Sequence, residues 1–198
     1  MSRFSTRFFV KSDARPFTAE PLSPFSGSLK ETFMSEVTKS RVDPLNRENY
    51  GAISAMLTVT DIEKTYEFCQ QAFGFEGRGI VPGPDGKPVH AELKLRDSVL
   101  MLNPECPDQQ GHSAKTLGNT PVTLYLYVED VDSLATQATK AGATLLQPPS
   151  DMFWGDRTAM LVDADGNKWM LATHRSEPTI DEMQAAMKEQ FAQMASPE

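Results

Sequence analysis

The chain has 198 residues, an apolar fraction of 39% and a formal net charge of −8. This length allows one domain with appendages, and it is enough to bury a hydrophobic core without disulfide bonds. The negative charge excludes the electrostatics of a nucleic-acid-binding protein, and no apolar run is long enough for a membrane-spanning helix. Two cysteines, Cys69 and Cys106, make no disulfide framework. We therefore expect a cytoplasmic protein.

Residues 1–50 differ in composition from the rest of the chain. They contain four prolines, Pro16, Pro21, Pro24 and Pro44, together with many Ser and Thr residues and no sustained apolar period. This composition is typical of an extended arm or a disordered leader. If the leader is ordered, we expect it to wrap over the domain or over a partner subunit.

The apolar pattern sharpens at Ile53 and predicts one strand, one helix and three more strands. Residues 53–60 predict a strand, Asp61 is the expected N-cap, and residues 62–73 predict a helix that ends at Gly74. The three further strand candidates are residues 79–81, 89–95 and 98–103.

The second half of the chain repeats this order. Val59 and Asp61 recur at Val128 and Asp130, an offset of 69 residues. The repeated elements are a strand at 122–128, a helix at 131–141 that ends at Gly142, and strands at 144–147, 158–162 and 168–173. Two copies of so long a unit indicate a duplicated βαβββ module rather than a solenoid. The sequence therefore predicts an α+β fold.

These patterns predict three parts. They are a leader at 1–50, a domain at 51–176 with modules 52–105 and 121–175, and a C-terminal helix at 177–198. Thr179 and Glu182 fit a capping box at the start of that helix. Its apolar stripe consists of Ile180, Met183, Met187, Phe191 and Met194. We expect this stripe to pack on its own sheet or on a second subunit.

Side chains alternate between the two faces of a strand. At 122–128, Leu124 and Leu126 fall on one face, while Tyr125 and Tyr127 fall on the other. At 90–95 the polar face holds His90, Glu92 and Lys94. The apolar faces are expected to pack under the helices. The mixed polar, aromatic and methionine faces favour a pocket, and the alternative is that they are only solvent-exposed.

Three stretches resemble the vicinal-oxygen-chelate superfamily, the glyoxalase, bleomycin-resistance and dioxygenase group. They are TVTDIEKTYEFCQQAFGFE at 58–76, HAELKLRDSVLMLNPE at 90–105 and MFWGDRTAMLVDADGNKWMLATH at 152–174. The last two are similar to its PhnB-like subgroup. The resemblance covers about residues 52–176. It implies two βαβββ modules whose sheets curl around a cavity, and a homodimer.

The resemblance also implies where a metal would bind. In metal-dependent members the ligands lie on the first and last strands of each module, which correspond here to Ser54, Met101, Thr123 and Met170. Neutral hydroxyls and thioethers are poor ligands for hard or borderline divalent ions. Asn167 also stands where the subgroup commonly has His. We therefore expect no metal and no other cofactor.

The leading hypothesis is a metal-free protein that binds a small molecule through stacking surfaces and a few polar anchors. The candidate ligand-binding residues are His90, Glu92, Met101, Thr123, Tyr125, Tyr127, Trp154, Arg157 and His174. For Trp154 and Arg157 a purely structural role is the alternative.

Two other functions remain open. One is a lyase, isomerase or dioxygenase with a relocated metal or with Glu92 as general base, assisted by His90 or His174. The other is an interaction protein that uses the leader and the C-terminal helix. The fold alone does not decide among them.

Overall fold

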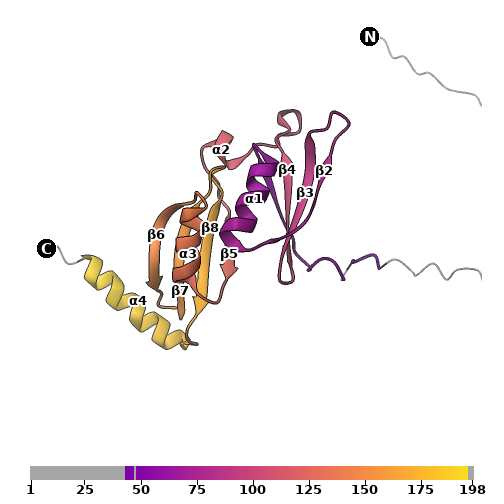
Figure 1. Ribbon diagram of the computed structural model, residues 1–198. Coiled ribbons are helices and arrows are strands. Elements are labelled where there is room, and N and C mark those ends of the chain that lie inside the picture. The colour runs from indigo at the N-terminus through magenta and orange to yellow at the C-terminus, as the bar shows by residue number, and fades with distance from the viewer. Residues whose placement is uncertain (1–42, 47, 196–198) are drawn as a thin grey trace, which may run out of the picture. The chain divides into compact units, whose positions relative to one another are not determined.

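A computed structural model describes residues 43–46 and 48–195 (Figure 1), so most of the predicted leader lies outside the described residues. The first module consists of β1 (Ala55–Val59), α1 (Ile62–Phe73), β2 (Glu76–Pro82), β3 (Pro88–Leu95) and β4 (Ser98–Pro104). The second consists of β5 (Thr123–Tyr127), α3 (Val131–Lys140), β6 (Thr144–Asp151), β7 (Asp156–Val162) and β8 (Lys168–His174). A 3₁₀ turn (Pro107–Gln109) and the short helix α2 (Ala114–Leu117) connect the modules, and α4 (Ile180–Ala195) follows them.

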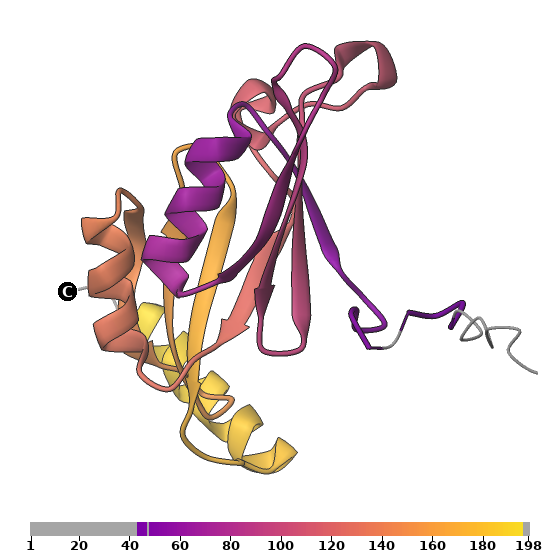
Figure 2. The ribbon, with the colours of Figure 1, turned by 45° about the vertical axis from the view of Figure 1, so that its right-hand side comes forward.

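Each module forms a four-stranded mixed sheet. The strand orders are β1-β4-β3-β2 and β5-β8-β7-β6. Strand β1 pairs in parallel with β4, and β5 pairs in parallel with β8. The strands twist and curl beside the helices without closing (Figure 2). The predicted α+β fold with two βαβββ modules is confirmed.

The predicted helix signals are also confirmed. The Asp61 carboxylate accepts a hydrogen bond from the Lys64 amide, and Gly74 ends α1 in the left-handed region at φ 74°. The Asp130 carboxylate accepts hydrogen bonds from two amides at the start of α3. That helix ends at Lys140, one residue earlier than expected. The connecting helix α2 was not predicted, because four residues are too few to show a helical period.

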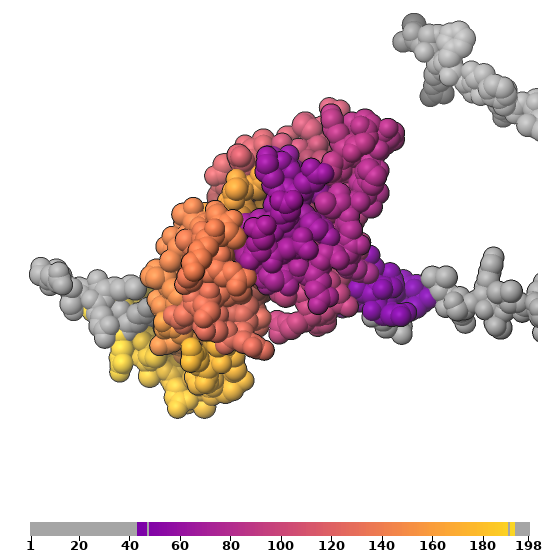
Figure 3. Space-filling model, in the orientation of Figure 1, coloured from indigo at the N-terminus to yellow at the C-terminus, as the bar shows by residue number. Residues whose placement is uncertain are grey.

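The helix-facing sides of both sheets share one core. The two helices α1 and α3 lie side by side (Figure 3). The ring centroids of Phe73, at the end of α1, and Trp169, on β8, lie 4.6 Å apart. The side-chain amide of Gln137 in α3 donates to the Gln71 carbonyl. Because both packed faces meet in this core, the other face of each sheet is turned away from it. These two outer faces are called the open faces below.

A turn in the second module holds the start of α1 in the first. The Asp165 carboxylate accepts hydrogen bonds from the Thr60 amide and hydroxyl, and Thr65 lies within reach of it. The neighbouring Asp163 carboxylate accepts from the Asn167 amide and the Trp169 indole. Asn167 is therefore part of this turn, which joins the modules.

Helix α4 begins with the predicted capping box. The Glu182 carboxylate accepts from the Thr179 amide, and the Thr179 hydroxyl accepts from the Glu182 amide. The helix extends past the end of β8 (Figure 1), and Ile180 and Phe191 are 69% and 65% exposed. Met187, between them on the stripe, is 38% exposed. No helix in the described ranges is both long and apolar enough to cross a membrane.

Candidate functional site

The open face of the first module carries a hydrogen-bonded cluster around Glu92. One carboxylate oxygen accepts from the Tyr50 hydroxyl at 2.6 Å, and the other lies 3.2 Å from the Arg78 guanidinium. Arg78 also lies over the Tyr50 ring, 4.9 Å from its centroid. The hydrogen bond to Glu92 raises the pKa of Tyr50. Both oxygens of Glu92 are therefore engaged by neighbouring side chains.

His90 belongs to the same cluster. Its Nδ1 lies 2.7 Å from the Asn103 side-chain oxygen, which can only accept, so Nδ1 carries the proton. Its Nε2 lies 3.6 Å from Glu92, which is too long for a hydrogen bond. The Asn103 amide donates to the sulfur of Met56. Nε2 is thus the ring nitrogen of His90 that makes no hydrogen bond to Glu92.

The open face of the second module is organised around a buried carboxylate, Asp156. It is 3% exposed. The hydroxyls of Tyr125 and Tyr127 donate to one of its oxygens at 2.9 and 3.1 Å, and His174 Nδ1 lies 2.8 Å from the other. Burial raises the pKa of Asp156, but hydrogen bonds from these groups and from Trp154 outweigh it, and the pKa lies below its usual value.

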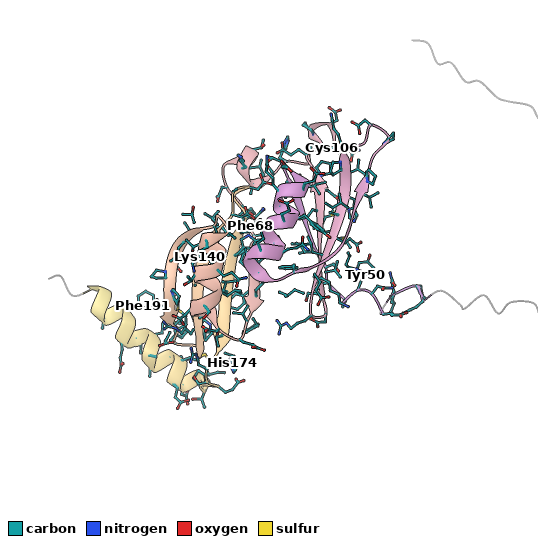
Figure 4. The ribbon with its side chains drawn as sticks, in the orientation of Figure 1. Tyr50, Phe68, Cys106, Lys140, His174 and Phe191 are labelled. Atoms are coloured by element: carbon teal, nitrogen blue, oxygen red, sulfur yellow. The ribbon has the colours of Figure 1, made fainter. Side chains whose placement is uncertain are left out.

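His174 lies at the end of β8, far from Tyr50 on the first module (Figure 4). Its Nε2 lies 3.0 Å from the carboxylate of Glu177, so both ring nitrogens face carboxylates. The bond to Asp156 is the main reason why the pKa of His174 is raised, and the charge of Glu177 adds to it. A histidine held this way favours the protonated form, which suits an anchor better than a general base.

Tyr125 and Tyr127 form an aromatic surface. Their ring centroids lie 5.3 Å apart, and the side chains are 43% and 48% exposed although their hydroxyls are fixed on Asp156. Burial and the bond to Asp156 raise the pKa of Tyr125 to about 12. Leu126, between them, lies in the core. The predicted alternation along this strand is therefore confirmed.

Arg157 does not share this face. It lies between Asp156 and Thr158 on β7, so its side chain points toward the helices. Its guanidinium forms two bonds to Asp132 of α3, at 2.8 and 2.9 Å, and one to Asp151. The structure thus turns Arg157 to the helix side of β7, in an ion-pair network, although it also lines a hollow next to Asp156. Trp154 stays beside Asp156 and packs edge-on against Phe153.

The inherited metal positions do not fit a metal. Met101 lies opposite Met56 on β1 and Glu92 on β3, and Met170 lies opposite Tyr125 on β5 and Met160 on β7. Methionine thioethers are therefore the main sulfur or oxygen groups at both positions. Ser54 and Thr123 offer only neutral hydroxyls. Within the described ranges, no three His, Cys, Asp or Glu side chains gather as a metal site would need.

Several residues of these clusters escaped the sequence reasoning. Asp156 lies within the MFWGDR motif, and its place after Gly155, at φ 98°, marks a sharp turn that could have indicated it. Tyr50 falls at the end of the predicted leader. Arg78 and Asn103 lie on strands with no periodic signal of a site. Thr158, which is 1% exposed and has an unpartnered hydroxyl, was also missed.

Two hollows lie near the second cluster. One, of about 330 Å³, lies between the β3–β4 turn and β5, and its lining includes Phe75, Arg96, Tyr125, Tyr127 and Trp169. The other, of about 430 Å³, lies where the loop before Asp156 meets residues 175–176. Both volumes are in the range of small-molecule sites.

Comparisons with known proteins agree with this architecture. Uncharacterized proteins of Mycobacterium bovis and Mycobacterium tuberculosis are each 41% identical over 142 residues. These cover 70% of this chain and 93% and 84% of the respective relatives. The crystal structure of TioX from Micromonospora has a TM-score of 0.51 at 27% identity and covers 63% of this chain and 99% of that one.

A family model also matches the chain. A sequence model described as the Glyoxalase/Bleomycin resistance protein/Dioxygenase superfamily matches residues 51–171. A glyoxalase/bleomycin resistance protein/dioxygenase family enzyme from Burkholderia phytofirmans shares the fold, with a TM-score of 0.50 at 21% identity over 61% of this chain and 96% of that one. This chain belongs to the glyoxalase/bleomycin resistance protein/dioxygenase superfamily.

Proposed function

We propose that this protein binds a small molecule without a metal, on the open faces of its two sheets. The observation that carries the proposal is the pair of half-exposed tyrosines whose hydroxyls are fixed on the buried Asp156. Fixed aromatic rings offer stacking area at little entropic cost. We place the chain in the PhnB-like subgroup on its MFWGDR and W-x-L-A-T-H elements.

The two open faces differ, and together they supply what a binding site needs. The first offers His90 Nε2 and the paired charges of Glu92 and Arg78, while the second offers Tyr125 and Tyr127. Met101 and Met170 lie at the centres of the respective faces and provide adaptable apolar contact. Thr123, at the start of β5, extends the second face.

We further propose that two copies assemble so that an open face of each contributes to one cavity. The first strand of each sheet is an edge strand, and the exposed apolar residues Ile53, Met56 and Val122 lie on or beside these edges. Exposed apolar patches and free strand edges are typical of assembly surfaces. Light scattering during gel filtration should give twice the mass of the chain, and a monomer at micromolar concentration would contradict this.

We also propose a cytoplasmic location and no nucleic-acid partner. Cys69 and Cys106 are both unpaired, which suits a reducing compartment. The net charge of −8 opposes binding to a polyanion.

The test of the binding proposal is a thermal-shift screen of small molecules against the full chain. We expect ligands that raise the melting temperature, with an effect lost in Tyr125→Ala and retained in the distant control Tyr66→Phe. Hits whose effect does not depend on Tyr125 would contradict this site. Turnover of a hit, lost in Glu92→Gln, would favour the enzymatic alternative, because His90 and Glu92 lie together there.

A further inference from the structure

The hollow of about 330 Å³ that Tyr125 and Tyr127 line lies where the two modules meet, at the free edge of β5. The first module contributes the start of β1 and the β3–β4 turn, which lies beside the end of β5 (Figure 2). Because β5 is an edge strand, residues from both of its faces line this hollow, Leu124 and Leu126 as well as the two tyrosines. It is called the inter-module hollow below.

The walls of the inter-module hollow are mostly apolar and aromatic. Phe75 and Trp169 are 7% and 0% exposed, and their ring centroids lie 6.4 Å apart. The hydroxyls of Tyr125 and Tyr127 are bonded to Asp156, which the lining does not include, so both rings are held in place. Walls of fixed aromatic rings favour a flat aromatic ligand, because little side-chain entropy is lost when it stacks.

Arg96, in the β3–β4 turn, is the charged residue among the described residues that line this hollow. One of its guanidinium N–H groups donates to the Tyr127 carbonyl at 2.8 Å, which ties the turn of the first module to β5 of the second. A guanidinium has five N–H donors. No carboxylate in the described ranges forms an ion pair with it. Its other donors are therefore available to an anionic ligand.

The backbone at Arg96 is a second observation that points to its side chain. Arg96 has φ 54°, in the left-handed region where glycine and asparagine are the least strained residues. An arginine at such a position costs stability, and strained residues of this kind cluster at ligand-binding sites. The position therefore favours a role for the guanidinium at the hollow rather than a role in forming the turn.

The carboxylates near the hollow do not neutralise Arg96. Asp97 follows it in the turn, but it accepts from the Ser98 hydroxyl at 3.3 Å and lies outside the lining. Asp156 is 3% exposed and is already engaged by both tyrosine hydroxyls and by His174. The net charge of −8 acts at longer range, where physiological ionic strength screens it. The nearest charge to a ligand in the hollow is therefore positive.

We propose that the inter-module hollow binds a flat aromatic carboxylate, with its rings against the aromatic walls and its carboxylate on the Arg96 guanidinium. Arginine and carboxylate groups form paired, charge-assisted hydrogen bonds, which fix the orientation of the ligand as well as its charge. The inference rests on the proposed small-molecule function, because Tyr125 and Tyr127 line this hollow, and it names the class of ligand that they help to bind.

The test compares three naphthalene probes of similar size on the full-length chain, at neutral pH and physiological ionic strength. Naphthoate is an anion, naphthamide is neutral, and naphthylmethylamine carries a cation. NMR titration should show naphthoate binding about tenfold more tightly than naphthamide, as expected for one charge-assisted contact. Naphthylmethylamine should bind most weakly. Intermolecular NOEs from bound naphthoate should reach Phe75 and Tyr127.

The variant Arg96→Asn tests the role of the guanidinium. Asparagine removes the charge and tolerates the left-handed backbone, so the turn should keep its conformation. The variant should lower the preference for naphthoate over naphthamide about tenfold, while the affinity for naphthamide changes little. The matched control is Lys87→Asn, which removes one positive charge from the exposed turn between β2 and β3 and should leave the preference unchanged.

Naphthamide or naphthylmethylamine binding as tightly as naphthoate, or no binding of any probe at millimolar concentration, would overturn selection for a carboxylate. So would a preference for naphthoate that survives in Arg96→Asn or that is lost equally in Lys87→Asn. The proposed function is judged separately, because a neutral or cationic hit from the screen that depends on Tyr125 would support binding while selection for a carboxylate failed.

Discussion

At the scale of single residues, His174 has the most specific electrostatic environment. Its pKa is raised above the usual 6.5, chiefly by the bond to Asp156. A raised histidine pKa stabilises the fold fully below pH 6.5, and this contribution is lost as the pH rises through the raised value. The protein should therefore lose part of its stability on the alkaline side of pH 6.5.

An NMR titration of the His174 ring checks this prediction. The pKa should lie above 6.5 and fall in Glu177→Gln, a change at a side chain that is 91% exposed. A His174 that titrates at or below 6.5 would contradict the two-carboxylate arrangement.

Leu126 and Tyr125 are neighbours with opposite roles. Leu126 is in the core, so Leu126→Ala should lower the free energy of unfolding by about 2–5 kcal/mol, the usual result of a core cavity. Tyr125→Ala should cost less stability, because the side chain is 43% exposed, but it should weaken the binding of screened ligands. Chemical denaturation and calorimetry measure the two effects. Equal destabilisation by both changes would contradict the face assignment.

At the scale of elements, the turn at Asp165 joins the modules. Its carboxylate is 6% exposed and accepts from both polar groups of Thr60, 105 residues away. Asp165→Ala should lower the free energy of unfolding by about 1–3 kcal/mol, because it removes two hydrogen bonds to a charged acceptor that is itself buried. The control is Asp85→Ala in the exposed β2–β3 turn. If Asp165→Ala lowers the free energy of unfolding no more than the control does, the turn at Asp165 does not hold the two modules together.

The leader is predicted to be dispensable. A truncation that begins at Asn46 keeps Asn49 and Tyr50, whose contacts with Arg78 and Glu92 tie the start of the domain to the first sheet. We expect the truncated chain to stay soluble and to melt cooperatively near the temperature of the full chain, as measured by circular dichroism. Insolubility or a much lower melting temperature would show that residues 1–45 belong to the fold.

The local elements were predictable because their signals are local. Asp61 and Gly74 bracket α1 in sequence, and Thr179 and Glu182 mark the start of α4. Strand ends were less accurate, as at β6, which runs four residues beyond the expected end through two prolines. An edge strand tolerates proline, since one side of its backbone has no partner.

The site was only partly predictable because its contacts are distant in sequence. Alternation correctly grouped Tyr125 with Tyr127 and His90 with Glu92. It also contained the signal that Arg157 lies with Ala159 and Leu161 on the helix side, which the site hypothesis overlooked. Nothing local showed that both tyrosines meet Asp156, 29 and 31 residues away.

At the scale of the whole molecule, the two modules share a core while their open faces remain available. The charged clusters are internally paired, so stacking surfaces and fixed acceptors are what these faces offer to a ligand. The packed faces and the Asp165 turn therefore stabilise the fold, while the open face of each sheet is the surface that we expect to bind a ligand.

The most direct test of metal-independent binding is calorimetric titration of a screened ligand into protein that has been dialysed against a chelator. Elemental analysis of the same sample should confirm the removal of Ni, Zn, Fe and Mn. We expect an unchanged dissociation constant after dialysis and loss of binding in Tyr125→Ala. Binding that disappears on chelation and returns with about one divalent ion per chain would contradict it.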